Sequence, residues 1–199
     1  MTAVETAIDA LRDGGLAILP TDTVYGLVGL GDSAAVASDL YRVKGRPAGQ
    51  PTALLFASVD TLADRLAGLP GDIAPVVRAL LPGPVTLVLP NPSRRFAWLS
   101  AERPDTIGVR VPELAGPGRV VLDAIGVLVA TSANLPGGAD PRRLADVPAE
   151  IRAATAALVD GGELGGAPST VVDVTGAEPV VLREGALPGA EALARIRGE

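Results

Sequence analysis

The sequence predicts an α/β fold built on one central sheet, and three observations lead to that expectation. Short apolar runs recur along the chain, and segments with helical periodicity separate them. Several of these runs contain no polar residue, which is typical of strands covered by helices on both faces of a sheet. The 199 residues show no linker and no internal repeat, so we expect a single domain over residues 1–199.

Capping signals mark the predicted helices. Thr2 and Glu5 fit a capping box, and Gly14 stops the helix that they begin. A second helix is expected from Asp32 or Ser33 to Lys44. Further helical segments are expected at residues 59–67, 72–81, 117–125, 149–158 and 189–197.

The predicted strands are short and mostly apolar. The first runs over residues 15–19 and ends at Pro20. The others are expected at residues 26–31, 53–57, 85–89, 107–111, 127–131, 170–174 and 180–183. Between them, residues 90–105 and 135–147 are rich in Pro, Gly and Arg, which predicts surface loops that are candidate lids.

The composition excludes several kinds of chemistry. The chain has neither Cys nor His, so it forms no disulfide, thiol nucleophile, Ser-His-Asp triad or His-ligated metal site. A metal would have to be held by oxygen ligands, which favours Mg²⁺, Mn²⁺ or Ca²⁺. The net charge of −6 argues against non-specific nucleic-acid binding as the main activity.

The expected setting is a reducing cytoplasm without membrane contact. No apolar run reaches the roughly 18–20 residues that a membrane span requires. The first residues also lack the basic and apolar regions of a signal peptide.

Two polar segments directly follow predicted buried strands, at residues 20–27 and 131–134. Ligands of open α/β sheets bind beyond the carboxyl ends of strands, so both segments are candidate site residues. The alternative interpretation is that they are turns stabilised by Asx and Ser/Thr caps.

Three cations are further candidates. Lys44 is the only lysine beside 16 arginines, and it ends a predicted helix. Helix capping is one interpretation, and contact between its compact ammonium and a phosphate is the other. Arg110 lies in an apolar strand with few acidic neighbours in the sequence, so it either reaches solvent or meets a ligand carboxylate or phosphate. The same choice applies to Arg183, for which Glu184 is an ordinary partner.

Taken together, these segments resemble the YrdC family, the threonylcarbamoyl-AMP synthases of tRNA modification, over residues 8–185. Six segments stand in the order of that family: residues 20–27 (PTDTVYGL), 44–47 (KGRP), 81–87 (LPGPVTL), 109–112 (VRVP), 131–134 (TSAN) and 169–173 (STVVD), the last followed by Leu182 and Arg183.

The resemblance implies a twisted mixed β-sheet flanked by helices with a large concave cavity, in the short single-domain form of the family. It also implies a reaction in which L-threonine, bicarbonate and ATP give threonylcarbamoyl-AMP and pyrophosphate. Mg²⁺ would be bound mainly through the ATP phosphates. A separate transferase complex would then modify an adenosine beside the tRNA anticodon, and weak RNA binding is a further expectation.

The resemblance also assigns residues by position. Lys44, Arg46, Ser132 and Asn134 are the implied catalytic residues. The implied threonine site consists of Thr23, Arg110, the backbone at Ala130, and Ser169. The implied nucleotide contacts come from Lys44, Arg46, Gln50, Thr106, Ser132, Asn134, Asp140 and Arg183.

Some positions depart from the family pattern. Asp140 stands where a small hydroxyl residue is usual, and its carboxylate would repel phosphates. Gln50 replaces a common Asn, Leu55 a His, and Pro168 a Glu.

Two other functions fit the same resemblance. One is a carbamoyl-transfer domain of the hydrogenase-maturation type, although such proteins usually carry zinc-binding cysteines. The other is an RNA-binding or ribosome-assembly module without catalysis, which the acidic composition and the five aromatic residues disfavour.

Overall fold

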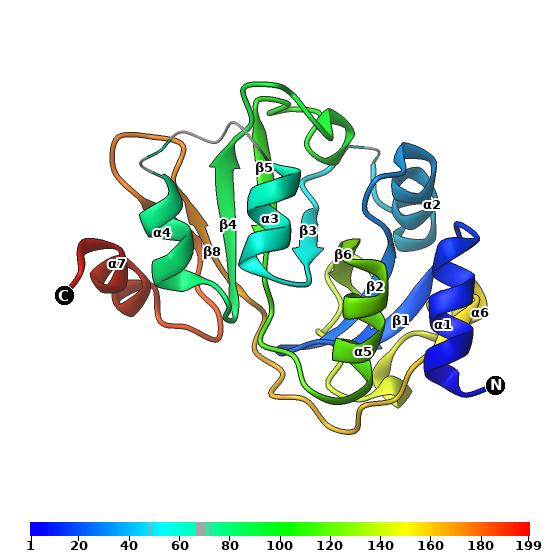
Figure 1. Ribbon diagram of the computed structural model, residues 1–199. Coiled ribbons are helices and arrows are strands. Elements are labelled where there is room, and N and C mark those ends of the chain that lie inside the picture. Colours follow the sequence, from blue (N-terminus) through cyan, green and yellow to red (C-terminus); the bar gives the residue numbers. More distant parts are fainter. Residues whose placement is uncertain (48, 67–70, 72) are drawn as a thin grey trace.

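The computed structural model describes residues 1–47, 49–66, 71 and 73–199. Within this part of the chain, nine strands form one sheet in the order β7-β1-β2-β6-β3-β5-β4-β8-β9 (Figure 1). The strands are β1 (Ala17–Pro20), β2 (Tyr25–Leu30), β3 (Ala53–Phe56), β4 (Val85–Pro90), β5 (Thr106–Arg110), β6 (Val127–Ser132), β7 (Ala157–Leu158), β8 (Thr170–Asp173) and β9 (Val180–Arg183).

The sheet mixes parallel and antiparallel pairs. The pairs β1–β7, β3–β5 and β4–β8 are parallel. The pairs β1–β2, β2–β6, β3–β6, β4–β5 and β8–β9 are antiparallel. The expected class, a mixed α/β sheet flanked by helices, is therefore confirmed.

One face of the sheet packs against a long helical layer. Its helices are α2 (Ala34–Lys44), α3 (Val59–Arg65), α4 (Ile73–Leu80) and α7 (Gly189–Arg197). Leu40, Leu62, Val77 and Ala192 of these helices join the larger apolar cluster, together with strand residues such as Leu87. Figure 1 shows α4 and α7 next to each other near the C-terminus, at the β8 end of the sheet.

The opposite face is covered over only part of its width. Helices α1 (Ala3–Arg12) and α5 (Gly116–Ile125) pack together there against β7, β1, β2 and β6. Their side chains form a second apolar cluster with Ala17, Leu19, Val28 and Leu128.

The expectation that helices cover both faces throughout is wrong for β5, β4 and β8. In β4, Leu87 and Leu89 point into the core, whereas Thr86 and Val88 line a cavity on the other face. This alternation follows from the two-residue period of a strand. The uncovered part of the face is where the candidate site lies.

The predicted helix ends are largely confirmed. The Thr2 hydroxyl and the Glu5 carboxylate form the expected capping box of α1. The Ser33 side chain accepts a hydrogen bond from Val36 N at the start of α2. Gly45 ends α2 with a φ of 62°, a left-handed conformation that glycine adopts without strain. Arg46 N then donates to Tyr41 O over 2.9 Å, so Arg46 leaves the helix axis immediately.

The predicted helix over residues 149–158 is wrong in its second half. Helix α6 (Ala149–Ala153) is short, and the chain then extends into β7, which pairs in parallel with β1. Backbone hydrogen bonds from Ala156 N to Leu16 O and from Val159 N to Ile18 O hold it there. Pairing with β1 at the edge of the sheet therefore overrides the local helical pattern.

Smaller differences concern the loops and two helix ends. Residues 90–105 and 135–147 contain the 3₁₀ helices η1 (Ala97–Leu99) and η2 (Leu144–Asp146). The predicted ends at positions 67 and 72 lie outside the described residues. Among the described helices, none is long and apolar enough to cross a membrane.

Candidate functional site

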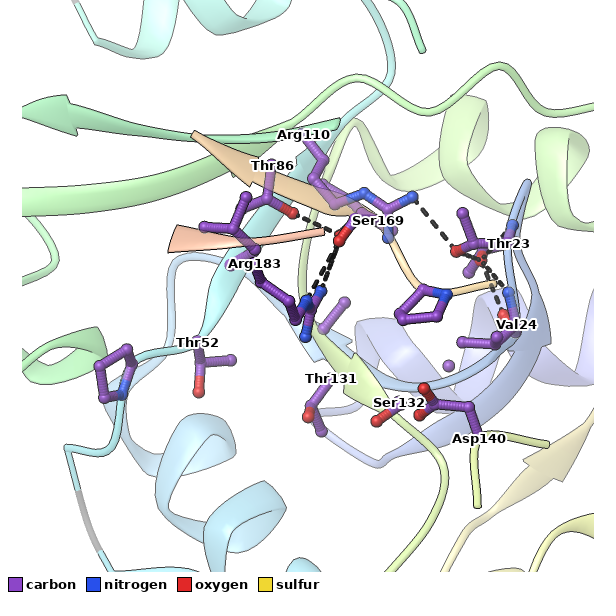
Figure 2. Close-up of a pocket in the computed structure, with 18 of the residues that line it drawn as sticks. Thr23, Val24, Thr52, Thr86, Arg110, Thr131, Ser132, Asp140, Ser169 and Arg183 are labelled. Atoms are coloured by element: carbon purple, nitrogen blue, oxygen red, sulfur yellow. Dashed lines mark hydrogen bonds between the residues drawn. The ribbon is translucent and has the colours of Figure 1, made fainter. Parts of the chain in front are cut away.

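A cavity of about 310 Å³ opens on the uncovered part of the sheet. Figure 2 shows that its wall carries both polar and apolar side chains and comes from segments far apart in the sequence. The wall consists of Thr21, Thr23, Val24, Gly26, Arg46, Pro51, Thr52, Ala53, Leu55, Thr86, Val88, Arg110, Ala130, Thr131, Ser132, Asp140, Pro168, Ser169, Val171 and Arg183.

At one side of the cavity, Arg110 ends strand β5 and is only 8% exposed. Its Nη2 donates to Asp22 Oδ1 over 2.6 Å and to Thr23 Oγ1 over 3.4 Å. Its buried Nε has no hydrogen-bond partner among the described residues. The two alternatives expected for Arg110, solvent or a ligand anion, are thus incomplete, because Asp22 reaches it from 88 positions away. We call Thr23 and Arg110 the Arg110 end of the cavity.

Asp22 is fixed from behind the cavity wall. Its second carboxylate oxygen accepts a hydrogen bond from Glu113 N over 3.3 Å. Burial raises the pKa of the Asp22 carboxyl, while the charge of Arg110 and the bond from Glu113 N act to lower it. Burial likewise lowers the pKa of Arg110, and the charge of Asp22 opposes that shift. Each charge therefore compensates the other in a site that excludes water.

The hydroxyls beside Arg110 belong to a well-ordered turn. Thr21 Oγ1 accepts from Thr23 N over 3.2 Å and from Val24 N over 3.3 Å, and it donates to Val24 O over 2.7 Å. Thr23 Oγ1 lies 3.1 Å from Thr21 Oγ1. The turn interpretation of this segment is therefore confirmed, and the turn presents Thr23 to the cavity.

Ser169 directly precedes β8 and Arg183 ends β9, and Figure 2 shows the two side chains next to each other. The Ser169 hydroxyl is 2.8 Å from that of Thr86. Arg183 Nη2 donates to Ser169 O over 2.8 Å and to Ser169 Oγ over 3.1 Å. Glu184 does not pair with Arg183 but instead accepts from Gly189 N. Ala130 of β6 also lines this wall, between Val28 of β2 and Ala53 of β3.

Lys44 lies beneath the cavity wall and is fully buried. Its Nζ donates to Ser132 O over 2.6 Å, to Asn134 Oδ1 over 2.7 Å, and to Asn134 O. The three ammonium protons thus all meet oxygens of Ser132, the last residue of β6, and of Asn134 in the segment that follows it. Lys44 neither caps its own helix nor reaches the cavity.

The segment after β6 is organised around Asn134. Its Oδ1 accepts from Ser132 Oγ over 2.7 Å, and its Nδ2 donates to Gly138 O over 2.7 Å and to Asp140 Oδ1 over 3.3 Å. Of the four implied catalytic residues, Arg46 and Ser132 line the cavity, whereas Lys44 and Asn134 hold the wall in place from behind.

Arg46, Ser132 and Asp140 form the second end of the cavity, which we call the Arg46 end. Burial lowers the pKa of Arg46 and the nearby charge of Arg183 lowers it further, while Tyr41 and Asp140 raise it. Asp140 is the single carboxylate residue of the wall. Figure 2 places it beside Ser132.

Two implied nucleotide contacts lie elsewhere. Gln50 is exposed, and Thr106 is buried with its hydroxyl bonded to Arg103 O over 2.9 Å. Neither belongs to the cavity wall. Sequence reasoning in turn missed Asp22 and Thr86. Asp22 stands in segment 20–27, which was already a candidate for the site. For Thr86, the available signal was the alternation within the strand, in which Thr86 and Val88 share one face and Leu87 and Leu89 the other.

A metal ion fits this site only as a companion of an anionic ligand. Among the described residues, no group of three or more acidic side chains could hold a metal ion. The oxygen ligands on the wall are Asp140 and hydroxyls such as those of Ser132 and Thr131, which suit Mg²⁺ that keeps water and phosphate ligands.

Comparisons with known proteins show the family and the fold of this chain. The Sua5/YciO/YrdC family model, described as "Telomere recombination", matches residues 9–185. The threonylcarbamoyl-AMP synthase of Pyrococcus abyssi is 32% identical over 98% of this chain and 57% of its own length. The threonylcarbamoyl-AMP synthase of Halorhodospira halophila is 39% identical over 82% of this chain and 84% of its own length. The crystal structure of P. abyssi Sua5 complexed with L-threonine superimposes with a TM-score of 0.83 at 31% identity, and the chain spans 57% of that protein.

Lys44 should titrate unusually low and make stability depend on pH. Burial, followed by the charge of Arg46, lowers the pKa of Lys44 from 10.5 to about 8. Between these two values the unfolded chain binds more protons than the folded protein, so the free energy of unfolding should rise with pH in that window. Because Lys44 is the only lysine, ¹⁵N-lysine labelling gives a single side-chain Nζ signal whose titration reports its pKa.

The matched control is Lys44→Met, which keeps a long unbranched side chain and removes the charge. Urea unfolding of both proteins at about pH 7.5 and about pH 10 gives the difference that belongs to Lys44, and other titrating groups cancel. A Nζ pKa close to 10.5 would contradict the buried environment described above.

Proposed function

The chain belongs to the Sua5/YciO/YrdC family, and on that premise we propose that it forms threonylcarbamoyl-AMP and pyrophosphate from L-threonine, bicarbonate and ATP. The observation that carries the proposal is one cavity with two chemically different ends. At the Arg110 end, the guanidinium of Arg110 forms an ion pair with Asp22 and has hydroxyl neighbours. Toward the Arg46 end, Arg46 and Arg183 form no ion pair with a carboxylate among the described residues.

The Arg110 end suits an amino acid. The unpartnered Nε of Arg110 offers a hydrogen bond to a carboxylate, and a guanidinium binds carboxylates by such directed donors. Thr23 and Ser169 offer hydroxyls for a substrate hydroxyl, while Ala130 and Val171 offer apolar surface for a methyl group. The L-threonine complex of P. abyssi Sua5, a relative with the same fold, supports threonine as the amino acid.

The Arg46 end suits a polyphosphate. Burial lowers the pKa of Arg46, and repulsion by the charge of Arg183 lowers it further. A bound polyanion relieves that repulsion, so the two guanidiniums are a prepared site for the ATP phosphates. The Ser132 and Thr131 hydroxyls add neutral hydrogen-bonding groups. When bound with ATP, Mg²⁺ supplies further charge neutralisation at the phosphates.

The reaction needs two bonds to form. The threonine nitrogen bonds to the carbon of bicarbonate with loss of water, and an oxygen of the resulting carbamate bonds to the α-phosphorus as pyrophosphate leaves. This chain has no histidine, and phosphoryl transfer of this kind depends on positioning and charge stabilisation. Arg110 would orient the amino acid, and Arg46 and Arg183 would stabilise the phosphates. Lys44 would hold Ser132 and Asn134 in place.

The product is a mixed anhydride, which is an activated carbamoyl donor. We propose that a separate transferase uses it to modify an adenosine next to the tRNA anticodon. The support is the family resemblance and the names of the relatives.

The deciding experiment measures pyrophosphate release from ATP with single components left out. The purified chain should release pyrophosphate only when Mg²⁺, threonine and bicarbonate are all present. Release that is independent of threonine would refute the proposed synthase.

Arg46→Ala should lower the turnover rate by about 10²-fold or more, because removing one preorganised charge from such a site costs roughly 3–4 kcal/mol. The half-buried Arg46 side chain forms no ion pair among the described residues, so the melting temperature should change little. Arg42→Ala is the matched control, since Arg42 lies four residues earlier, is exposed on α2 and pairs with Asp39. Equal rates for the two variants would remove Arg46 from the phosphate site.

Amino-acid preference should show that the Arg110 end recognises a hydroxyl. Serine lacks one methyl group and should react roughly 10–200-fold more slowly than threonine. Valine leaves buried hydroxyl partners unpaired and should fall by about 10⁴-fold. Pyrophosphate release with each amino acid at equal concentration gives the order. If valine exceeds serine, the roles given to Thr23 and Ser169 are incorrect.

A further inference from the structure

The three guanidiniums of the cavity differ in one respect, which is whether a carboxylate neutralises them. Arg110 forms an ion pair with Asp22 at 2.6 Å. Arg183 donates only to neutral oxygens of Ser169, and neither Arg183 nor Arg46 has a carboxylate ion pair among the described residues.

The three cations form one continuous electrostatic group. The charge of Arg183 lowers the pKa of Arg46 and also that of Arg110, so Arg183 acts on both ends of the cavity. Without Asp22, a phosphate would meet a positive wall at either end. With Asp22, the Arg110 end holds one cation and one carboxylate, whereas the two cations Arg46 and Arg183 share the single wall carboxylate of Asp140.

Asp22 is built into the fold as a permanent partner. Its side chain is only 6% exposed, and it does not belong to the cavity wall. Its two oxygens are held by Arg110 and by Glu113 N. A ligand in the cavity therefore meets Arg110 with its countercharge already in place behind it.

We propose that Asp22 is the residue that keeps phosphate groups out of the Arg110 end and leaves that end to a monocarboxylate. This inference rests on the proposed function in one respect, namely that the amino-acid carboxylate binds at Arg110. Asp22 acts through Arg110 and does not touch the substrate.

The discrimination follows from charge. A carboxylate brings one negative charge and accepts the hydrogen bonds that Arg110 still offers, including the one from its buried Nε. A phosphate brings up to two negative charges and meets the repulsion of Asp22 in a low-dielectric site, where like charges interact strongly. A triphosphate is thereby directed to Arg46 and Arg183, and the threonine position stays free for threonine.

The test is competition between inorganic phosphate and threonine. Calorimetric titration with threonine, in the presence and absence of phosphate, measures it. In the wild-type protein, excess phosphate should leave the threonine Kd unchanged. In Asp22→Asn, phosphate should occupy Arg110 and weaken apparent threonine binding by roughly tenfold or more, as expected when one like charge is removed from a buried site. A merely structural role of Asp22 would lower the melting temperature without creating this phosphate sensitivity.

Two controls locate the effect. Asp123→Asn removes an exposed carboxylate on α5 that pairs with Arg119, and it should behave like the wild type. In direct phosphate titration, the double variant Asp22→Asn with Arg110→Gln should lose the phosphate binding that Asp22→Asn gains, because the cation that attracts phosphate is gone.

The outcomes separate this inference from the proposed function. If threonine binds to both proteins and phosphate competes equally in both, or in neither, Asp22 does not discriminate and the proposed function stands. If neither protein binds threonine, the proposed amino-acid site is refuted, and direct titration with phosphate still compares the two proteins. A phosphate site that appears only in Asp22→Asn then supports the inference that Asp22 keeps phosphate away from Arg110. Removing one partner of a buried ion pair is costly. If the variant does not fold, the measurement on the wild-type protein tests the inference. A threonine Kd that rises with phosphate in the wild-type protein overturns the inference, and an unchanged threonine Kd supports it.

Discussion

Helices α1 and α5 cover one face of the sheet only as far as β6, and the cavity exists because that layer stops there. The strands beyond β6 must contribute apolar side chains to a packed core on one face and line a cavity on the other. Strand β4 does so by alternation, with Thr86 and Val88 on the cavity side and Leu87 and Leu89 in the core. The same short segments therefore determine both stability and the shape of the site.

The second requirement is that three of the cations at or beneath the cavity wall have oxygens assigned to them before any ligand arrives. Lys44 is held by the segment after β6, Arg110 by Asp22, and Arg183 by Ser169. The carboxylate of Asp22 is itself held by a backbone N–H, so the position of Arg110 depends on main chain and not on mobile side chains. Preorganised charges of this kind need no rearrangement during a reaction, which is how they stabilise a transition state.

Local signals predicted the parts of the fold that depend on local physics. The caps at Thr2 and Ser33 and the left-handed Gly45 were readable because each acts within a few residues. The second half of the predicted helix at residues 149–158 was wrong because β7 is decided by its pairing with β1. Asp22 was missed as the partner of Arg110 for a similar reason, since 88 positions separate the two and only the sheet order brings them together.

The environment of Lys44 explains why the only lysine of an arginine-rich chain stands at this position. An ammonium has three donors on a single small nitrogen, and here three oxygens of Ser132 and Asn134 accept all of them in a fully buried space. A guanidinium is planar, has five donors and spreads them over three nitrogens, so it could not meet the same three oxygens without leaving buried donors unpaired. The resemblance implied that Lys44 contacts the nucleotide, whereas the structure gives it a role through Ser132 and Asn134. The requirement for lysine then comes from the geometry of the segment after β6, and any effect on a bound nucleotide is transmitted by the wall that this segment forms.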